Sequence, residues 1–226
     1  MGSWPIGTLV SVEGSHVFDG LTRVHPAQQE RSRRALRDTL EAFESLLKER
    51  SYSGVTMQDV ADRAGLAITS VYARFEGKSA LVLAAHERII DSGIAVFDAM
   101  VEAEAVHPSD TRDFVTALIA GTAEYAERDS HILRAVLAAN DEETNERAAL
   151  FIRASSERIA KILAPRLTQS LAEAERDIDF AWRSVMAVLQ QTWALWGADL
   201  GRFPVGKDEL VRRLTDQFMA AISDGA

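Results

Sequence analysis

The sequence predicts an all-α protein, and three observations support this fold class. Apolar residues recur at helical spacing in one segment after another from residue 26 onward. The first such stripe consists of Leu36, Leu40, Phe43 and Leu47. Pro26, Pro108 and Pro165 lie where helices are expected to begin or end. No segment reads as a convincing β-strand, and no internal repeat or low-complexity tract is present.

The N-terminal third is predicted to contain three helices followed by a much longer one. Thr56 is the expected N-cap of the second helix, because Thr56 and Asp59 have the spacing of a capping box. Gly65 breaks the pattern between the second helix and the third. The expected helices cover residues 26–50, 57–64, 68–74 and 78–106.

The C-terminal two-thirds is predicted to be helical throughout. The segment 180–200 is apolar on most sides, which predicts burial on several faces. The last helix carries Leu210, Leu214, Phe218 and Ile222 at regular four-residue steps. The expected helices cover residues 114–127, 132–138, 142–163, 180–200 and 208–223.

Composition excludes several classes of protein. At 226 residues and 47% hydrophobic content, the chain can bury a sizeable core. The absence of cysteine excludes disulfides, Cys–zinc sites and thiol catalysis. No apolar run approaches the roughly 18 residues of a membrane span, and the first residues lack the pattern of a signal peptide. We therefore expect a soluble, cytoplasmic protein without a membrane partner.

The charge is distributed unevenly along the chain. The net charge of −9 argues against a protein that binds nucleic acid regardless of sequence. Residues 23–88, however, contain 11 basic and 9 acidic residues, whereas residues 89–226 contain 14 and 23. Only the N-terminal third is therefore suited to approach a phosphate backbone.

Residues 56–75 have the pattern of a helix-turn-helix. Two short helices that cross steeply need a small residue at the crossing, which Ala61 supplies, and a glycine at the turn, which is Gly65. Val60, Val71 and Phe75 supply apolar contacts beneath the second helix. This pattern favours a DNA-binding motif whose second helix enters the major groove, with a purely structural αα-hairpin as the alternative.

From about residue 33 to residue 81 the chain resembles the TetR family of transcriptional regulators. The matching elements are Tyr52, Asp59-Val60-Ala61, Ala64-Gly65, the run 71–75, Lys78 and Leu81. The chain departs from the pattern at Ser51, at Ala67, where a serine usually caps the recognition helix, and at Ile68 and Thr69, which affect the operator sequence rather than the fold.

The resemblance implies two domains with different functions. Residues 26–77 would form the DNA-binding domain, and residues 78–226 a helical domain for effector binding and dimerisation. Residues 1–25, which show no sustained period, are expected to be a flexible arm. The expected function is that of a ligand-responsive repressor that binds a near-palindromic operator as a homodimer. The alternative is a helical scaffold with a degenerate helix-turn-helix.

Side chains around the motif are candidates for contact with double-stranded DNA. Short hydroxyls at the start of the recognition helix suit base edges or phosphates, an isoleucine suits a thymine methyl, and the remaining residues suit the phosphate backbone. Lys78 also begins a helix, where an ammonium and a helix N-terminus can together bind an anion. The predicted set is Thr56, Gln58, Ile68, Thr69, Ser70, Tyr72, Arg74 and Lys78. The neighbouring basic run consists of Arg31, Arg33, Arg34 and Arg37.

No pattern of catalytic or metal-binding residues survives inspection. Two Glu-x-x-His strings occur, Glu13–His16 and Glu104–His107, but the first contains Gly14-Ser15 and the second abuts Pro108. No nucleophilic residue has a sequence spacing from a histidine that would indicate a catalytic pair, and no glycine-rich loop could hold a phosphate. We expect neither enzymatic activity nor a metal or cofactor.

The C-terminal residues are compatible with both implied roles. Aromatic and apolar side chains with a few polar ones could line a pocket for a small apolar effector. The candidates are Phe114, Leu118, Thr122, Tyr125, Phe151, Trp182, Met186, Gln190 and Trp193. The helices 180–200 and 208–223 are long and apolar enough for a two-fold, four-helix dimer interface.

Overall fold

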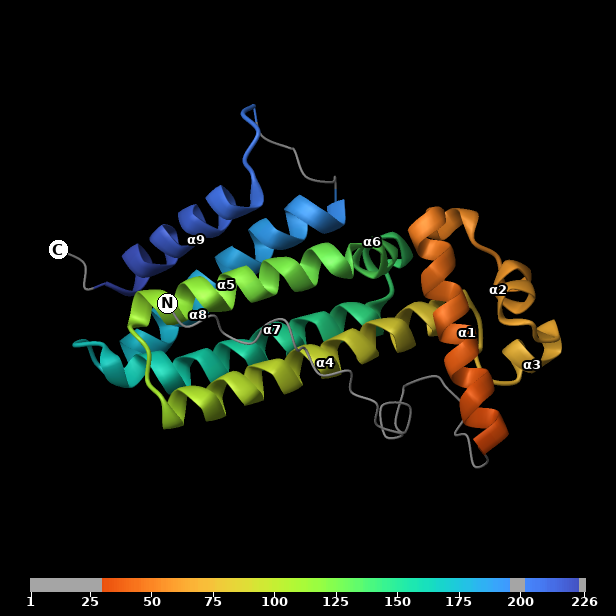
Figure 1. Ribbon diagram of the computed structural model, residues 1–226, viewed down its shortest axis with the longest axis horizontal. Coiled ribbons are helices and arrows are strands. Elements are labelled where there is room, and N and C mark those ends of the chain that lie inside the picture. Colours follow the sequence, from red (N-terminus) through yellow and green to blue (C-terminus); the bar gives the residue numbers. More distant parts are fainter. Residues whose placement is uncertain (1–29, 196–201, 224–226) are drawn as a thin grey trace. The chain divides into compact units, whose positions relative to one another are not determined.

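The computed structural model describes residues 30–195 and 202–223, and every element in them is helical (Figure 1). This confirms the predicted fold class. The α-helices are α1 Glu30–Glu49, α2 Met57–Ala64, α3 Ile68–Tyr72, α4 Lys78–Val106, α5 Thr111–Arg128, α6 Ser130–Ala139, α7 Glu142–Leu163, α8 Leu171–Gln190 and α9 Lys207–Ile222. Two 3₁₀ turns, η2 Tyr52–Gly54 and η3 Ala164–Arg166, and a π-helical turn, η4 Gln191–Leu195, complete the described elements. None of the helices described combines the length and apolarity that a membrane span requires.

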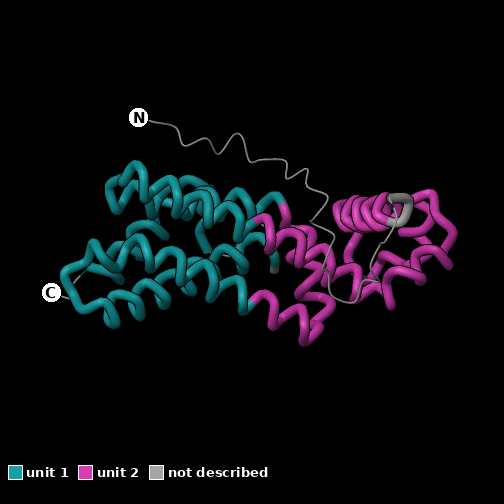
Figure 2. Tube along the Cα trace, turned by 90° about the horizontal axis from the view of Figure 1, so that it is seen from below, with its two compact units in different colours: residues 1–9, 93–128, 149–226 teal, residues 10–92, 129–148 magenta. Residues whose placement is uncertain are grey.

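The helices group into two compact units (Figure 2). We call described residues 30–92 and 129–148 the N-terminal unit, and described residues 93–128, 149–195 and 202–223 the C-terminal unit. The division falls inside α4 and inside α7, so α6 groups with the first three helices. The functional boundary expected at residue 78 stays a prediction.

The core of the N-terminal unit is built on the apolar stripe of α1. Leu36, Leu40, Phe43 and Leu47 are all buried, as their spacing predicts. Helix α1 packs against α2 and α6, and α6 also contacts η2. Burying a side chain of this size stabilises the fold by about 1.5–3 kcal/mol. This packing holds α2 and α3 beside α1 within the unit (Figure 1).

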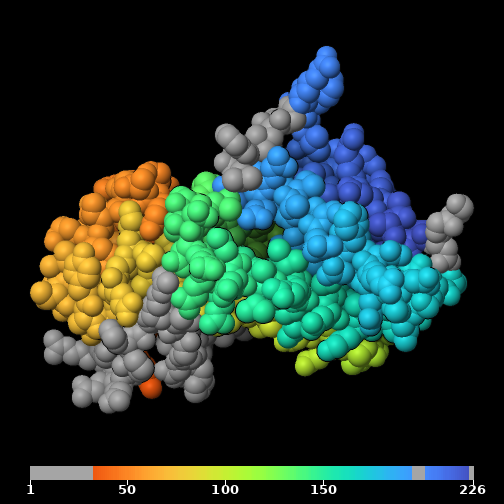
Figure 3. Space-filling model, turned by 180° about the vertical axis from the view of Figure 1, so that it is seen from behind, coloured from red at the N-terminus to blue at the C-terminus, as the bar shows by residue number. Residues whose placement is uncertain are grey.

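The core of the C-terminal unit lies where α5, α8 and α9 pack together. Trp182 of α8 is fully buried, and its indole Nε1 donates a hydrogen bond to Ser155 Oγ at 2.8 Å. On α9, Leu214, Phe218 and Ile222 are buried, so the regular apolar stripe of this helix faces the chain's own core. Helices α7 and α8, green-cyan to light blue, form much of the face seen in Figure 3.

Helix α8 differs from the expected helix over residues 180–200. It begins at Leu171, because Ser170 and Glu173 form a capping box that stops the first turn from fraying. After Gln190 the chain continues as the π-helical turn η4, and residues 196–200 of the expected helix lie outside the described residues. Helix α3 is also shorter than expected, since it ends at Tyr72. The expected arm 1–25 and Pro26 likewise lie outside the described residues.

Candidate nucleic-acid interface

Helix α2 begins at the predicted capping box. The backbone N–H of Asp59 donates to Thr56 Oγ1 at 3.1 Å, and the backbone N–H of Thr56 donates to Asp59 Oδ2 at 2.9 Å. Hydrogen bonds from the Thr56 side chain and backbone hold the pKa of the Asp59 carboxyl below its usual value. The Thr56 hydroxyl is therefore already engaged within the protein, although the residue is exposed.

The turn between α2 and α3 needs the glycine that the sequence supplies. Gly65 has φ 66 and ψ 32, in the left-handed region where a side chain costs free energy. The backbone N–H of Leu66 donates to the Ala61 carbonyl at 2.9 Å, which closes the end of α2. Ala61 itself is fully buried, as a residue at a close helix crossing must be.

The predicted contact residues of helix α3 differ in their exposure to solvent. Val71 and the following Phe75 are fully buried and fix its inner face. Thr69 and Tyr72 are exposed, Tyr72 by 51%, whereas Ile68 and Ser70 are half-buried. The N-cap of α3, Ala67, makes no side-chain hydrogen bond, as the missing serine predicts.

The two basic residues after α3 are turned toward the protein backbone. The Arg74 guanidinium donates through Nη1 to the Ser70 carbonyl. Lys78 Nζ donates to the carbonyls of Tyr52 and Val55, each at 2.8 Å, and burial lowers the pKa of Lys78. The ammonium also lies 4.2 Å from the centre of the Tyr52 ring. The anion site expected at Lys78 therefore has an ammonium that is held by carbonyl oxygens.

The basic residues of α2 and the preceding turn are paired with carboxylates. Arg63 forms a two-pronged ion pair with Glu49, both contacts at 2.9 Å, and this hydrogen bonding lowers the pKa of the Glu49 carboxyl. Arg50 lies 3.3 Å from Asp59. These pairs hold α1 and α2 together but leave little positive charge for DNA on α2.

Gln58, also a predicted contact, is exposed near the start of α2. Its amide Nε2 donates to Asp62 Oδ1 at 2.7 Å. An amide has a second donor and an acceptor oxygen, so this hydrogen bond leaves capacity for a phosphate contact.

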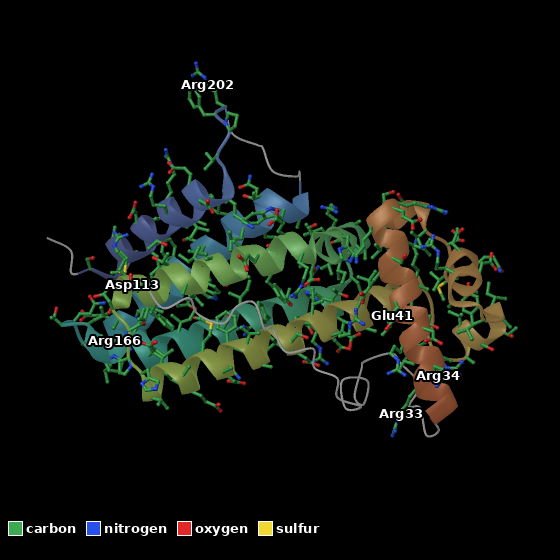
Figure 4. All side chains as sticks on the ribbon, in the orientation of Figure 1. Arg33, Arg34, Glu41, Asp113, Arg166 and Arg202 are labelled. Carbon is green, nitrogen blue, oxygen red and sulfur yellow. The ribbon has the colours of Figure 1, made fainter. Side chains whose placement is uncertain are left out.

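Unpaired positive charge is found on α1 instead. Arg34, Arg37 and Lys48 are exposed, and none of them forms an ion pair with a residue that the structure describes. Figure 4 shows Arg33 and Arg34 on the first turns of α1, and Arg33 is half-buried. The side chain of Arg31 lies outside the described residues. Sequence reasoning singled out the run but did not show that the cations of the motif itself face inward.

The candidate effector residues all belong to the C-terminal unit, with different exposure. The buried ones are Phe114, Leu118, Phe151, Trp182 and Trp193. Thr122, Tyr125 and Met186 are half-buried, and Gln190 is exposed. The Thr122 hydroxyl donates to the Leu118 carbonyl at 2.8 Å, so its hydrogen bond is made within α5. The pocket assignment stays a prediction.

An aromatic cluster in this unit includes a residue that sequence reasoning missed. Phe97 of α4 makes edge-to-face contacts with Phe151, at 6.1 Å between ring centroids, and with Trp182, at 5.7 Å. Gly93, one helical turn earlier, lets the Phe151 ring approach, because an added Cβ would lie 2.9 Å from Phe151 Cε2. The Gly93–Phe97 spacing on one helix face was the available signal.

Glu104 of the second Glu-x-x-His string has a structural role. Its side chain is buried and accepts hydrogen bonds from the Ser109 N–H at 2.6 Å and from Arg166 Nη2 at 2.7 Å. Burial alone would raise its pKa, but these bonds outweigh burial and lower it. His107 is exposed, and no group of three or more metal-ligating side chains occurs in the described part of the chain. Glu13 and His16 lie outside it.

The family model and the solved structures that match this chain both come from bacterial regulatory proteins. Residues 40–85, which contain α2, α3 and the start of α4, match the family model described as bacterial regulatory proteins, tetR family. No curated protein matches the sequence significantly. Solved structures do match in fold, three of them at sequence identities of 16%, 19% and 19%.

Three of these structures belong to proteins described as TetR-family transcriptional regulators. That from Mesorhizobium loti has a TM-score of 0.64 at 16% identity and covers 86% of this chain and 98% of its own. PfmR from Thermus thermophilus gives 0.55 at 19% identity, with coverage of 83% and 99%. A regulator from Streptomyces coelicolor gives 0.62 at 19% identity, with coverage of 83% and 79%.

Proposed function

We propose that this chain is a TetR-family transcriptional regulator, because residues 40–85 match the family model, and that it acts as a cytoplasmic, ligand-responsive repressor that binds a near-palindromic operator as a homodimer. Regulators of this family are DNA-binding transcription factors and not enzymes. The observation that carries the proposal is the helix-turn-helix of α2 and α3, which is capped at Thr56, turned at Gly65 and exposed at Thr69 and Tyr72.

For DNA binding we assign α3 to the major groove. Thr69 and Tyr72 are exposed on α3. Ile68 and Ser70 are partly accessible and would contact DNA at the edge of this helix surface. A hydroxyl reads base edges or phosphates, so Ser70→Ala is expected to change the preference among operator variants. Equal losses on specific and random duplexes would remove Ser70 from the base-reading set.

For dimerisation we propose the outward faces of α8 and α9. The stripe containing Leu214 and Phe218 is buried within the chain, so the interface must use other residues. Phe180 of α8 is 63% exposed, and the Arg183 guanidinium lies 5.8 Å from the centre of its ring. An exposed aromatic side chain with a cation beside it is common at protein interfaces. A two-fold dimer would place its recognition helices about 34–36 Å apart, or a multiple of that distance.

For release from DNA we propose that a small apolar effector binds in the C-terminal unit, near the aromatic residues of α5, α7 and α8. Helix α4 runs without a break from Lys78 to Val106, so displacing its later turns would move its first turns as a lever. The effector must bind the misaligned state more tightly than the DNA-competent state. A coupling of about 1–3 kcal/mol would weaken operator binding about 5- to 150-fold.

The proposal is tested first by a gel shift. The folded dimer, confirmed by size-exclusion chromatography, is titrated at low salt against the DNA upstream of its own gene. A shifted complex that survives competition with random DNA is expected. A folded dimer that shifts no duplex would instead support the helical scaffold.

The lever is tested by linkage once an effector is known. Operator DNA must weaken effector binding by the same factor by which the effector weakens operator binding. Equal effector affinities with and without saturating operator would contradict the lever.

A further inference from the structure

We propose that the pair Ser92–Gly93 is a hinge in α4, the point at which this helix bends when the helix-turn-helix is repositioned. The inference rests on the proposed function, because it concerns how a displaced α4 would act on the helix-turn-helix. The lever then bends at a fixed point near its middle instead of moving as one rigid rod.

The residue types at this pair weaken α4 locally. Gly93 is the only glycine in the 29 residues of α4, and a glycine inside a helix has the lowest propensity of any residue except proline. The hydroxyl of the preceding Ser92 donates to the Arg88 carbonyl at 3.0 Å, so it competes for an acceptor of the helix. Such bonds often bend helices, and Gly/Ser pairs are among the few recognised causes of helix kinks. Helix α4 is continuous in this structure but is weakest at this pair.

Helix α4 is held on both sides of the pair. Before it, Arg88 forms an ion pair with Glu44 of α1, and both residues are half-buried. After it, Phe97 is buried in the aromatic cluster described above. The division between the N-terminal and the C-terminal unit falls between Ser92 and Gly93. The weak pair therefore separates a segment that is fixed to α1 from a segment that is fixed to the aromatic cluster.

Helix α7 offers no comparable bending point. It also passes from one unit to the other, at Ala148–Ala149, and its sequence contains neither glycine nor proline. Alanine is the best helix former, so this crossing is stiff. The remaining crossing, at Arg128–Asp129, lies between α5 and α6 and not within a helix. A bend within a helix is therefore expected in α4.

The variants must separate a hinge from simple packing, because Gly93 also makes room for the Phe151 ring. An added Cβ would lie 2.9 Å from Phe151 Cε2. Ser92→Ala removes the competing hydroxyl and adds no atom. Gly93→Ala combined with Phe151→Leu removes the glycine and relieves the clash, with Phe151→Leu alone as its reference. Gly121→Ala is the matched control, since its Cβ meets nothing within 4 Å and α5 stays within one unit.

The first measurement is hydrogen exchange along α4, which reports local opening whether or not DNA binds. We expect the amides of residues 92–97 to exchange faster than those of the turns on either side. From the helix propensities, exchange at these amides should slow about twofold in Ser92→Ala and about fivefold in the double variant relative to Phe151→Leu. Gly121→Ala should leave them unchanged.

The second measurement is the tolerance of half-site spacing. The wild-type protein selects a duplex from a randomised library, and one base pair is then added or removed between the half-sites, which moves them by about 3.4 Å. A hinged dimer adapts to this change by bending α4. We expect the stiffened variants to bind the selected duplex as before, and to lose a further two- to fivefold (about) on the altered duplexes for each protomer that bends. Gly121→Ala should keep the wild-type tolerance.

Several results would overturn the hinge. Uniform exchange along α4 would show that the pair is not a weak point. A double variant that matches Phe151→Leu in both measurements would show that the glycine serves packing alone. Equal losses of tolerance in Gly121→Ala and in the α4 variants would show a general effect of helix stability. A folded wild-type protein that selects no duplex would overturn the proposed function, and hydrogen exchange would then decide the hinge by itself.

Discussion

The substitution Ala67→Ser should stabilise the helix-turn-helix. Ala67 is the N-cap of α3, with φ −65 and ψ 140, which is the extended geometry that a capping serine needs. The backbone N–H of Ser70 already donates to the Ala67 carbonyl at 2.8 Å. The introduced hydroxyl would therefore accept from the N–H of Thr69, without any change of the backbone.

The expected gain is about 0.5–1 kcal/mol, the lower part of the range for an N-cap, because Ala67 is exposed and water satisfies the amide before substitution. For a chain of this length such a gain raises the melting temperature by about 1–4 °C. Thermal and urea unfolding are measured at fixed protein concentration, since the stability of the proposed dimer would depend on it. Hydrogen exchange of the Thr69 amide should also slow.

Ala73→Ser is the matched control, since Ala73 is exposed at the other end of α3 with helical φ −65 and ψ −13. Serine there has no orphan amide to cap and should cost a few tenths of a kcal/mol. Equal effects of the two substitutions, or no gain from Ala67→Ser, would refute the reasoning from the missing cap.

Three further predictions test other parts of the structure. Thr56→Ala removes the hydroxyl that accepts from the Asp59 N–H and donates to Asp59 Oδ2, keeps the bond from the Thr56 N–H, and should cost about 1–2 kcal/mol in urea unfolding. Gly93→Ala places a Cβ 2.9 Å from the Phe151 ring and should cost about 1–3 kcal/mol, whereas Gly121→Ala meets no atom within 4 Å and should be stabilising. His86 is buried, which lowers its pKa from 6.5 to about 4, so the unfolded chain binds the extra proton and stability falls as the pH drops from 6.5 to 4. His86→Leu should remove about 3 kcal/mol of that pH dependence; an unchanged pH profile would exclude the histidine as its cause.

Periodicity and capping patterns located most of the helices. The bounds of α2 and α7 agree with those expected, because each has a clear capping or acidic first turn and a definite end. The start of α8 was missed although Ser170 and Glu173 have the same spacing as Thr56 and Asp59. The turns that follow Ser170 bury only small or isolated apolar residues, while Leu171 is 62% exposed, so no strong stripe marks them.

The inward direction of the motif's cations could not be predicted. Lys78 and Arg74 donate to backbone carbonyls, which every residue has, so no residue type in the sequence reveals the partner. The ion pair of Arg63 with Glu49 joins residues 14 apart on different helices and needs the crossing of α1 and α2 to form. The grouping of α6 with the N-terminal helices likewise depends on tertiary packing.

The distribution of engaged and exposed cations has a consequence for how this protein would select its operator. If Lys78 and Arg74 remain on their carbonyls, the exposed cations near the motif that form no ion pair among the described residues are Arg34, Arg37 and Lys48, since Arg50 and Arg63 are paired with carboxylates. Three in each protomer give a dimer about six phosphate contacts and a salt slope near −5, against about −9 if the two inward cations also contacted phosphate. A net charge of −9 weakens non-specific attraction further. Discrimination would then depend mainly on the short side chains of α3.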